Sequence, residues 1–375
     1  MERTYQICTK CIMDTTYPDI KFDKNGICNF CREYETEAKQ YIYSGEEGER
    51  KLNTFIEKVK QKGRGRKYDC IIGVSGGIDS TYTAYLVKKY GLRPLAVSLD
   101  NGWDTELAGR NVEKALKKLD IDFYKYTVDW EEFRDLQLAY LKASVIDIEM
   151  LTDHAIRATL FRAAADRDIK YIILGTNVTT EGIRVPEWGH DMNDLTNLKD
   201  IYRRFGSGKL KTMPTMSLYR EIFYRTVKGI KITSVLNYVP YIQEEVKELI
   251  TRELDWEDYG PKHYESIFTR FYQAYILPRK FNVDKRKAYL SNLIHSGQLT
   301  RDEAVKEILK EPYSEEDLRK DKEYCLKRFR LSEGEFESLM DLPIKNHSDF
   351  RSDIRGRSVI RFIYGMSGGS RFIDG

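Results

Sequence analysis

Residues 70–80 read Cys-Ile-Ile-Gly-Val-Ser-Gly-Gly-Ile-Asp-Ser, an apolar run that leads directly into a glycine-rich turn. The pattern predicts a buried strand over Cys70–Val74, a tight turn at Ser75–Gly77 and a helix from Asp79. Such a turn directs backbone N–H groups and the positive end of a helix at one point, which makes an anion site. Glycine fits there because the backbone must approach a phosphate closely or take positive φ. The segment lacks the Gly-Lys-Ser/Thr ending of a Walker loop and the G-x-G-x-x-G spacing of a dinucleotide-binding turn.

What remains is a pyrophosphate cradle with one carboxylate and two hydroxyls. The segment resembles the PP-loop of the ATP pyrophosphatases, enzymes that split ATP into AMP and pyrophosphate. We expect the backbone of Val74, Ser75, Gly76 and Gly77 to hold the phosphates of ATP and Ser80 to donate to a phosphate oxygen. Asp79 is the expected ligand of the Mg²⁺ that ATP carries, because hard cations prefer carboxylate oxygen.

Composition and length limit the remaining classes. The 375 residues suffice for two domains or three small units. A net charge of +3 does not indicate a nucleic-acid binder. No apolar run approaches transmembrane length, and the amino terminus lacks the apolar core of a signal peptide. We therefore expect a cytoplasmic protein with neither a membrane nor a nucleic acid as its partner.

Four of the six cysteines form two C-x-x-C pairs, Cys8 with Cys11 and Cys28 with Cys31, with sixteen residues between the pairs. The spacing is typical of a four-cysteine zinc site, and clustered cysteines fit a reducing compartment better than a disulfide framework. Because sulfur would fill all four positions, the zinc is expected to be structural. The segment has few apolar residues, so the metal should supply its folding free energy. An iron–sulfur cluster, with the same ligand count, is the alternative.

Strands and helices alternate after the glycine-rich turn. Helices are expected at 79–89, 105–119, 131–148 and 152–168, and further strands at 95–99, 123–128 and 171–174. This order predicts an α/β fold with a doubly wound parallel sheet of the PP-loop type. Ligands of such sheets bind beyond the carboxyl ends of the strands. The PP-loop, Asp100-Asn101 and Gly175-Thr176-Asn177 should therefore line one crevice.

Each strand end has an expected role and a simpler alternative. Asp100 and Asn101 lie where ribose or base would be held, unless they form a plain turn. Gly175 would allow close approach of the nucleotide. Asn177 would donate to the nucleotide or to the activated substrate, whereas Thr176 and Asn177 could instead cap a helix.

Two further cationic side chains are candidates for phosphate contacts. Arg157 lies one turn from His154 and would grip the developing phosphate charge, or else both lie on an exposed polar face. Lys209 and Lys211 belong to a glycine-containing loop, residues 205–211, that would close over leaving pyrophosphate. An ordinary surface loop is the alternative.

The chain divides into three parts: a zinc knuckle and linker (1–50), an ATP pyrophosphatase domain (51–235) and a mainly helical carboxyl-terminal region (236–375). In the last part, aromatic residues 268–275 are expected in a core. Lys262, His263 and Glu265 are expected at the mouth of the crevice. Arg270, Arg279 and Lys280 would meet a nucleotide-sugar diphosphate or a uronate, or lie on an exposed face. The tail, with arginines at 351, 355, 357, 361 and 371, is expected to be loosely ordered.

Six segments together carry a wider resemblance: Cys8–Asp14, Gly73–Ser80, Asp100–Trp103, Thr152–Arg157, Gly175–Asn177 and Lys262–Ser266. From Cys8 to about Met340 the chain resembles the N-acetyl sugar amidotransferases of bacterial surface-polysaccharide and flagellin-glycan pathways. The resemblance implies that ATP adenylates the acetamido oxygen of a nucleotide-activated sugar, as in lipopolysaccharide O-antigen synthesis. Ammonia then displaces AMP and leaves an acetamidino group.

The ammonia source is inferred separately. Glu2 excludes an amino-terminal cysteine glutaminase, and neither Cys70 nor Cys325 lies on a glycine-flanked elbow. The resemblance implies a partner pair similar to the glutaminase and cyclase subunits of imidazole glycerol phosphate synthase. A homo-oligomer is left open.

Two other readings compete with this one. A PP-loop tRNA-modifying enzyme of the thiolation or lysidine type also adenylates a carbonyl oxygen, but it would want free cysteines in the crevice and a more basic chain. A nucleotide-binding scaffold without catalysis would not need Asp79 and the paired serines.

Overall fold

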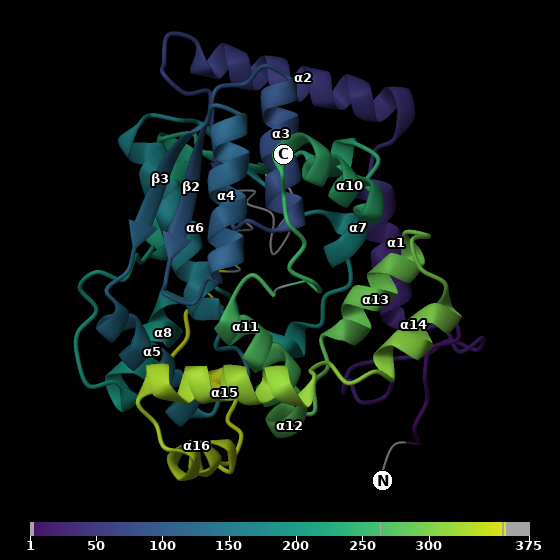
Figure 1. Cartoon of the computed structure of the whole chain (residues 1–375), viewed down its shortest axis with the longest axis vertical. Coiled ribbons are helices and arrows are strands. Elements are labelled where there is room, and N and C mark those ends of the chain that lie inside the picture. The colour runs from purple at the N-terminus through teal and green to yellow at the C-terminus, as the bar shows by residue number, and fades with distance from the viewer. Residues whose placement is uncertain (1–3, 263, 355, 358–375) are drawn as a thin grey trace.

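The computed structural model describes residues 4–262, 264–354 and 356–357. The strands form one five-stranded parallel sheet with the order β3-β2-β1-β4-β5. Its edge strand β3 and the neighbouring β2 are labelled in Figure 1. The strands are β1 (Cys70–Gly73), β2 (Pro94–Asp100), β3 (Asp122–Thr127), β4 (Tyr171–Leu174) and β5 (Lys231–Ser234). The predicted parallel α/β fold is confirmed, and the PP-loop leaves β1 at the position where the strand order reverses. This switch point is where open α/β sheets bind ligands.

Alternating residues of β1 face two separate cores, as a buried parallel strand requires. Cys70 and Ile72 pack with α2 (Gly45–Gly63), α3 (Ile78–Lys89), α4 (Glu106–Lys118) and α10 (Gln243–Leu254). Ile71 packs on the other face with α6 (Met150–Asp166). The sheet is thus covered on both sides. Near one end of it, α5 (Trp130–Ala143) packs against α8 (Leu195–Phe205).

The observed elements lie close to the expected ones, with one strand missed. β4 has the expected bounds, and Thr105 caps α4 through a hydrogen bond from Ala108 N. The unexpected strand is β5, which has only four residues and follows α9 (Leu218–Ile222) and the π-helix η2 (Phe223–Val227). It pairs with β4 in register from Tyr171 opposite Lys231.

The carboxyl-terminal region is helical, as expected. Its elements are α11 (Ile267–Phe271), η4 (Tyr272–Ile276), α12 (Leu277–Phe281), α13 (Arg286–His295), α14 (Arg301–Ile308), α15 (Glu315–Phe329), α16 (Glu333–Met340) and η5 (His347–Asp349). Phe268, Phe271 and Tyr272 are buried, so these aromatic residues belong to a core. None of the helices in the part of the chain that the structure describes is long and apolar enough to cross a membrane.

Three cations of this region have partners within the protein, and a contact with a nucleotide-sugar diphosphate or a uronate stays a prediction for each. Arg270 forms a two-pronged ion pair with Asp321, at 2.6 and 2.7 Å. Arg279 pairs with Glu337 at 2.7 Å. Lys280 Nζ donates to the three carbonyls of residues 339, 340 and 342, which end α16. Internal acceptors therefore hold all three.

The amino-terminal segment packs on the carboxyl-terminal helices. Its one helix, α1 (Asn29–Tyr41), contacts α13 and α7 (Val178–Glu181). The Arg301 guanidinium donates to the carbonyls of Cys8 and Cys11, at 3.0 to 3.3 Å. Lys287 pairs with the buried Asp14 at 2.5 Å. The two ends of the chain are thus joined by polar contacts.

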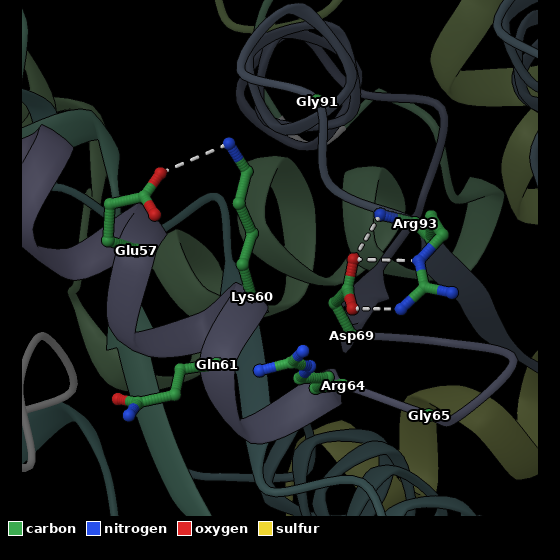
Figure 2. A pocket seen from close by; sticks show the side chains of 8 residues that line it. All are labelled: Glu57, Lys60, Gln61, Arg64, Gly65, Asp69, Gly91 and Arg93. Carbon is green, nitrogen blue, oxygen red and sulfur yellow. Dashed lines mark hydrogen bonds and ion pairs between the residues drawn. The ribbon is translucent and has the colours of Figure 1, made fainter.

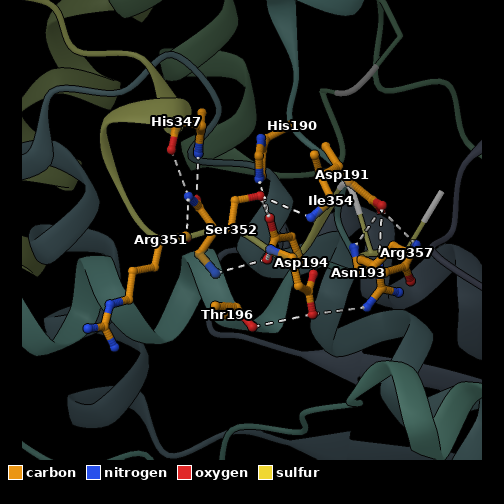
Figure 3. Close-up of polar contacts among 12 residues, drawn as sticks. His190, Asp191, Asn193, Asp194, Thr196, His347, Arg351, Ser352, Ile354 and Arg357 are labelled. Carbon is orange, nitrogen blue, oxygen red and sulfur yellow. Dashed lines mark hydrogen bonds and ion pairs between the residues drawn. The ribbon is translucent and has the colours of Figure 1, made fainter. Parts of the chain in front are cut away.

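The expectation of a loosely ordered tail is wrong for the residues described there, 351–354 and 356–357. Figure 3 shows this segment on the loop between η1 (Pro186–Trp188) and α8. Arg351 N donates to Asp200, and Ser352 Oγ donates to Asp194. Arg357 is fully buried and donates to Glu221 Oε2 at 2.9 Å. The arginines at 355, 361 and 371 lie outside the described residues.

Candidate active site

The PP-loop is a compact turn held by its own serines. Ser75 Oγ and Ser80 Oγ are 3.2 Å apart, and Ser80 Oγ also accepts from Ser75 N and donates to Gly77 O. Gly76 has φ +81°, and a Cβ there would lie 2.4 Å from the carbonyl oxygen of Ala108. Positive φ and this contact with α4 explain why glycine occupies position 76. The turn ends at Gly77, where α3 begins and directs its N–H groups outward.

Asp79 lies in the first turn of α3 and meets residues from three other segments of the chain. Tyr241 donates a hydrogen bond to Asp79 Oδ1. Lys262 Nζ lies 3.6 Å from Asp79 Oδ2 and 2.7 Å from Oε1 of Glu181, which ends α7. Side-chain exposure is 22% for Asp79, 23% for Glu181 and 19% for Lys262, so the group is largely shielded from solvent. The ammonium group thus lies between two carboxylates at the mouth of the PP-loop.

The charges of this group depend on one another. Burial raises the pKa of Asp79, and the charge of Glu181 raises it further, whereas Lys262 opposes both effects. Burial alone would lower the pKa of Lys262, but Glu181 and Asp79 outweigh it and raise the pKa above its usual value. A cation is therefore strongly favoured between these carboxylates. Carboxylate oxygens in this arrangement are suitable ligands for a divalent ion such as Mg²⁺.

The segment before Lys262 covers the PP-loop. Trp256 Nε1 donates to Gly76 O at 2.9 Å. The Tyr259 hydroxyl lies 3.1 Å from the position that a Cβ on Gly77 would take. The expectation for Lys262 thus agrees with the geometry, while His263 lies outside the described residues.

Asp100 and Asn101 form the turn at the end of β2. Asp100 accepts from Gly102 N at 2.9 Å and pairs with Lys125 at 2.7 Å. Burial raises the pKa of Asp100, but Lys125 and the Gly102 N–H outweigh this and lower it. Asn101 accepts from Trp103 N and donates to Thr152 Oγ1 at 3.1 Å, which joins β2 to the first turn of α6. Both residues have these local partners, and nucleotide contacts by them stay a prediction.

The end of β4 combines a close approach with a helix cap. A Cβ on Gly175 would lie 2.7 Å from the backbone of Asp79, so glycine is needed for the packing of β4 against α3. The carbonyl of Thr176 accepts from Ser234 Oγ, at the end of β5. Asn177 caps α7, since its Oδ1 accepts from Thr180 N at 2.9 Å. Its Nδ2 is buried and has no hydrogen-bond partner in the described part of the chain, so the side chain retains a donor at this edge.

Arg157 and His154 are not on an exposed face. Arg157 pairs with Glu221 of α9 at 2.8 Å, and its side chain is 18% exposed. His154 is buried, with Nδ1 bonded to Met192 O and Nε2 accepting from Met216 N. Both residues thus contact segments that precede β5 in the chain. A phosphate contact by Arg157 stays a prediction.

The loop that carries Lys209 is fixed to α5. Asp135 accepts from Ser207 and Gly208, and Glu132 accepts from the backbone N–H groups of 211, 212 and 213. Movement of Lys209 over the crevice requires these hydrogen bonds to break.

The four amino-terminal cysteines meet in one buried cluster. Their Sγ atoms all lie within 4.8 Å of one another, and the Cys8–Cys31, Cys11–Cys28 and Cys28–Cys31 separations are 3.6, 3.7 and 3.5 Å. A tetrahedral site with Zn–S bonds of about 2.3 Å needs sulfur atoms about 3.8 Å apart. Backbone N–H groups of Lys10, Cys11 and Cys28 point at Cys8 Sγ, which suits a thiolate. The cluster therefore fits a tetrahedral metal.

A separate open groove of about 560 Å³ lies at the other end of the sheet (Figure 2). Its lining comprises Glu57, Lys60, Gln61, Arg64, Gly65, Asp69, Gly91 and Arg93. Because β1 and β2 begin just after Asp69 and Arg93, this groove lies at the amino ends of the strands. It is remote from the PP-loop and contains none of the predicted site residues.

Sequence reasoning missed Glu181 and Tyr241. Glu181 follows Asn177 by four residues, one turn of the helix that Asn177 caps. A carboxylate one turn beyond a strand end was the available signal. Tyr241 comes from the segment after β5, and no local pattern marks it.

Fold and site together define an α/β protein with a doubly wound parallel sheet and a glycine-rich anion-binding turn at its switch point. Residues 265–363 match the family model for the C-terminal domain of WbpG-like lipopolysaccharide biosynthesis proteins. The expected relation to surface-polysaccharide proteins is thereby confirmed for the carboxyl-terminal region.

Two relatives are similar to this chain over different lengths. An uncharacterized protein from Methanocaldococcus jannaschii is 23% identical over 313 residues, 81% of this chain and 93% of its own length. A glutamine-hydrolyzing GMP synthase from Pyrobaculum aerophilum is 37% identical over 75 residues, 20% of this chain and 14% of its own.

Similar solved structures include NMN synthetase from Francisella tularensis, with a TM-score of 0.38 and 16% identity over 76% of this chain and 96% of that chain. The NH3-dependent NAD synthetase from Campylobacter jejuni has a TM-score of 0.29 and 14% identity, over 54% of this chain and 84% of that chain. Likeness at this level bears on neither substrate nor activity.

Proposed function

We propose that the protein is an ATP-dependent amidotransferase that converts the acetamido group of a nucleotide-activated N-acetyl sugar into an acetamidino group, for a bacterial surface glycan. The observation that carries the proposal is the convergence of Asp79, Glu181 and Lys262 on the PP-loop at the switch point of the sheet. The match of residues 265–363 to a lipopolysaccharide biosynthesis family supports the substrate class.

The reaction has two displacements. The amide oxygen attacks the α-phosphorus of ATP, and pyrophosphate leaves. Ammonia then attacks the activated carbon, and AMP departs with the former amide oxygen. An amide is a poor electrophile because its nitrogen donates into the carbonyl, and adenylation turns that oxygen into a good leaving group.

The chain's own residues position charge for the first displacement. We expect the backbone N–H groups of Gly76 and Gly77, with the hydroxyl of Ser75, to bind the leaving pyrophosphate, which would replace the 3.3 Å hydrogen bond from Gly77 N to Ser75 Oγ. Lys262 neutralises the charge that develops there, and fixed charges of this kind need no reorganisation during the reaction. Asp79 and Glu181 would hold Mg²⁺, which offsets the negative charge of the phosphates. Zinc at the four cysteines would keep the amino-terminal segment folded.

The two cysteines outside the cluster support a separate source of ammonia. Cys70 and Cys325 are both fully buried, and burial raises the pKa of each thiol. A glutaminase nucleophile needs an accessible thiolate, which neither position offers. We infer that a partner protein, the glutaminase and cyclase-like pair, hydrolyses glutamine and supplies ammonia.

The direct test uses purified protein, ATP, Mg²⁺ and ammonium chloride at pH 8.5 with a panel of nucleotide-linked acetamido sugars. The expected products are AMP, pyrophosphate and a sugar whose mass is lower by the difference between O and NH. Asp79→Asn is the matched variant and should abolish all three. Formation of ADP, or AMP formation that depends on tRNA instead of a sugar, would contradict the proposal.

A further inference from the structure

An exposed apolar stripe runs along α9 and η2, beside the β5 edge of the sheet. Tyr219, Phe223 and Val227 are 79%, 44% and 70% exposed. Their four-residue spacing places them on one side of the helical segment. Of the eleven large apolar side chains that are exposed in the described part of the chain, three lie within these nine residues. Single exposed apolar residues are ordinary, but a group on one face indicates an interaction surface.

The opposite side of this segment is fixed to the body of the protein. Tyr224 stacks on Phe161 of α6 with ring centroids 6.0 Å apart. Glu221 accepts from Arg157, Arg225 and Arg357 at 2.8, 3.1 and 2.9 Å. The stripe is therefore presented by a rigid support, which lowers the entropy cost of binding.

The rim of the stripe is basic. Between Met213 and Ser234 the sequence holds four cations and one acid, Glu221, which is buried. The side chains of Arg220 and Lys228 have no hydrogen-bond or ion-pair partner among the described residues. A second copy on a two-fold axis would bring like charges together. An apolar patch with an acidic rim on a different protein fits this surface better.

The stripe is connected to the candidate active site. Met216 N, just before α9, donates to His154 of α6, and the first turn of α6 contacts Asn101 through Thr152. β5, which follows the stripe, ends at Ser234, whose hydroxyl donates to Thr176 O. The Tyr219 end of the stripe is therefore the end linked to the residues where the strands end, whereas its Lys228 end lies beside Lys170, just before β4 begins.

We propose that Tyr219, Phe223 and Val227, with Arg220 and Lys228 at the rim, form the docking surface for the ammonia-supplying partner, and that this partner presents an apolar patch with an acidic rim. The inference rests on the proposed function, because that function requires an external source of ammonia. It commits to a protein partner; three apolar side chains are a small anchor for a membrane.

The test measures binding of the purified glutaminase and cyclase-like pair to the full chain, which needs no turnover. The double variant Tyr219→Ser/Phe223→Ser should bind the pair at least about tenfold more weakly, as expected for aromatic anchors. Arg220→Glu/Lys228→Glu should weaken binding similarly at low salt and less at high salt. Leu309→Ser is the matched control, because Leu309 is 78% exposed and lies outside the stripe. This variant should leave the affinity for the pair unchanged.

Three results would overturn the inference. The first is unchanged affinity in both double variants, or absence of binding by the wild-type chain. The second is a wild-type dimer that Tyr219→Ser/Phe223→Ser dissociates, which assigns the stripe to a second copy. The third is binding to phosphatidylglycerol vesicles that the same variant loses. Ammonium-driven turnover without the pair tests the proposed function separately, and the stripe variants should leave that rate unchanged.

Discussion

Replacing Lys262 with methionine tests the central electrostatic argument. The substitution keeps much of the side-chain volume and removes the ammonium group that lies between Asp79 and Glu181. Two carboxylates then face each other with about a fifth of each side chain exposed. Removing one partner of a fully buried ion pair costs about 3–5 kcal/mol, whereas an exposed pair is worth about 0–1 kcal/mol. For this exposure we expect a loss of about 2 kcal/mol, or about 2–3 °C in Tm for a chain of 375 residues.

Mg²⁺ should reverse most of that loss. In the variant a divalent ion can take the position of the ammonium group, while in the wild type it competes with Lys262. We therefore expect millimolar Mg²⁺ to raise the Tm of Lys262→Met more than that of the wild type, in calorimetry without nucleotide at pH 7.5. Lys322→Met is the control. Lys322 is 18% exposed and, like Lys262, pairs with two carboxylates, those of Glu333 and Glu337. The Tm of this variant should fall without rescue by Mg²⁺. Equal Mg²⁺ effects in wild type and Lys262→Met would refute the reasoning.

Three further predictions follow from the same structure. Gly76→Ala places a Cβ 2.4 Å from Ala108 O at φ +81° and should lower the free energy of unfolding by about 1–3 kcal/mol. It should also weaken binding of a non-hydrolysable ATP analogue in calorimetry. Gly334→Ala, at a position with open space around it, should have neither effect. Arg157, Arg225 and Arg357 outweigh burial and lower the pKa of Glu221 from 4.5 to about 2. Glu221 should thus contribute up to about 3 kcal/mol above pH 5, lost as the pH falls from 4.5 towards 2; an equally steep acid-side fall in the Tm of Glu221→Gln would contradict this. Metal analysis should find zinc in the purified protein and none in Cys28→Ser, with a lower Tm for that variant; iron with sulfide in place of zinc would support the alternative cluster.

The central elements of the fold could be predicted from the sequence because residues close together in the chain determine them. An apolar run, a glycine turn and a helix start are all set by neighbours along the chain, so β1, the PP-loop and α3 could be predicted together. β5 was missed because four residues, Lys231–Ser234, with one exposed lysine do not make a periodic pattern. Its identity as a strand comes from pairing with β4, which is a tertiary contact.

The candidate site shows the same division. Asp79 and the serines lie in one contiguous motif, whereas Glu181, Tyr241 and Lys262 come from three segments that only the folded chain brings together. The arginines at 270 and 279 looked available for phosphate because their counter-ions, Asp321 and Glu337, are about 50 to 60 residues away in sequence. Charge pairing over such distances cannot be recognised from spacing.

The contacts of Arg301 with the carbonyls of Cys8 and Cys11 impose an order on the folding steps that take place during synthesis at the ribosome. The cysteine segment is translated first, yet the side chain that donates to its carbonyls emerges almost three hundred residues later. The cysteine segment can bind its metal early, but it cannot pack in its final position until Arg301, at the start of α14, has left the exit tunnel. Completion of the amino terminus is therefore a late folding event, and a ribosome that stalls before α14 leaves the first-made module unattached.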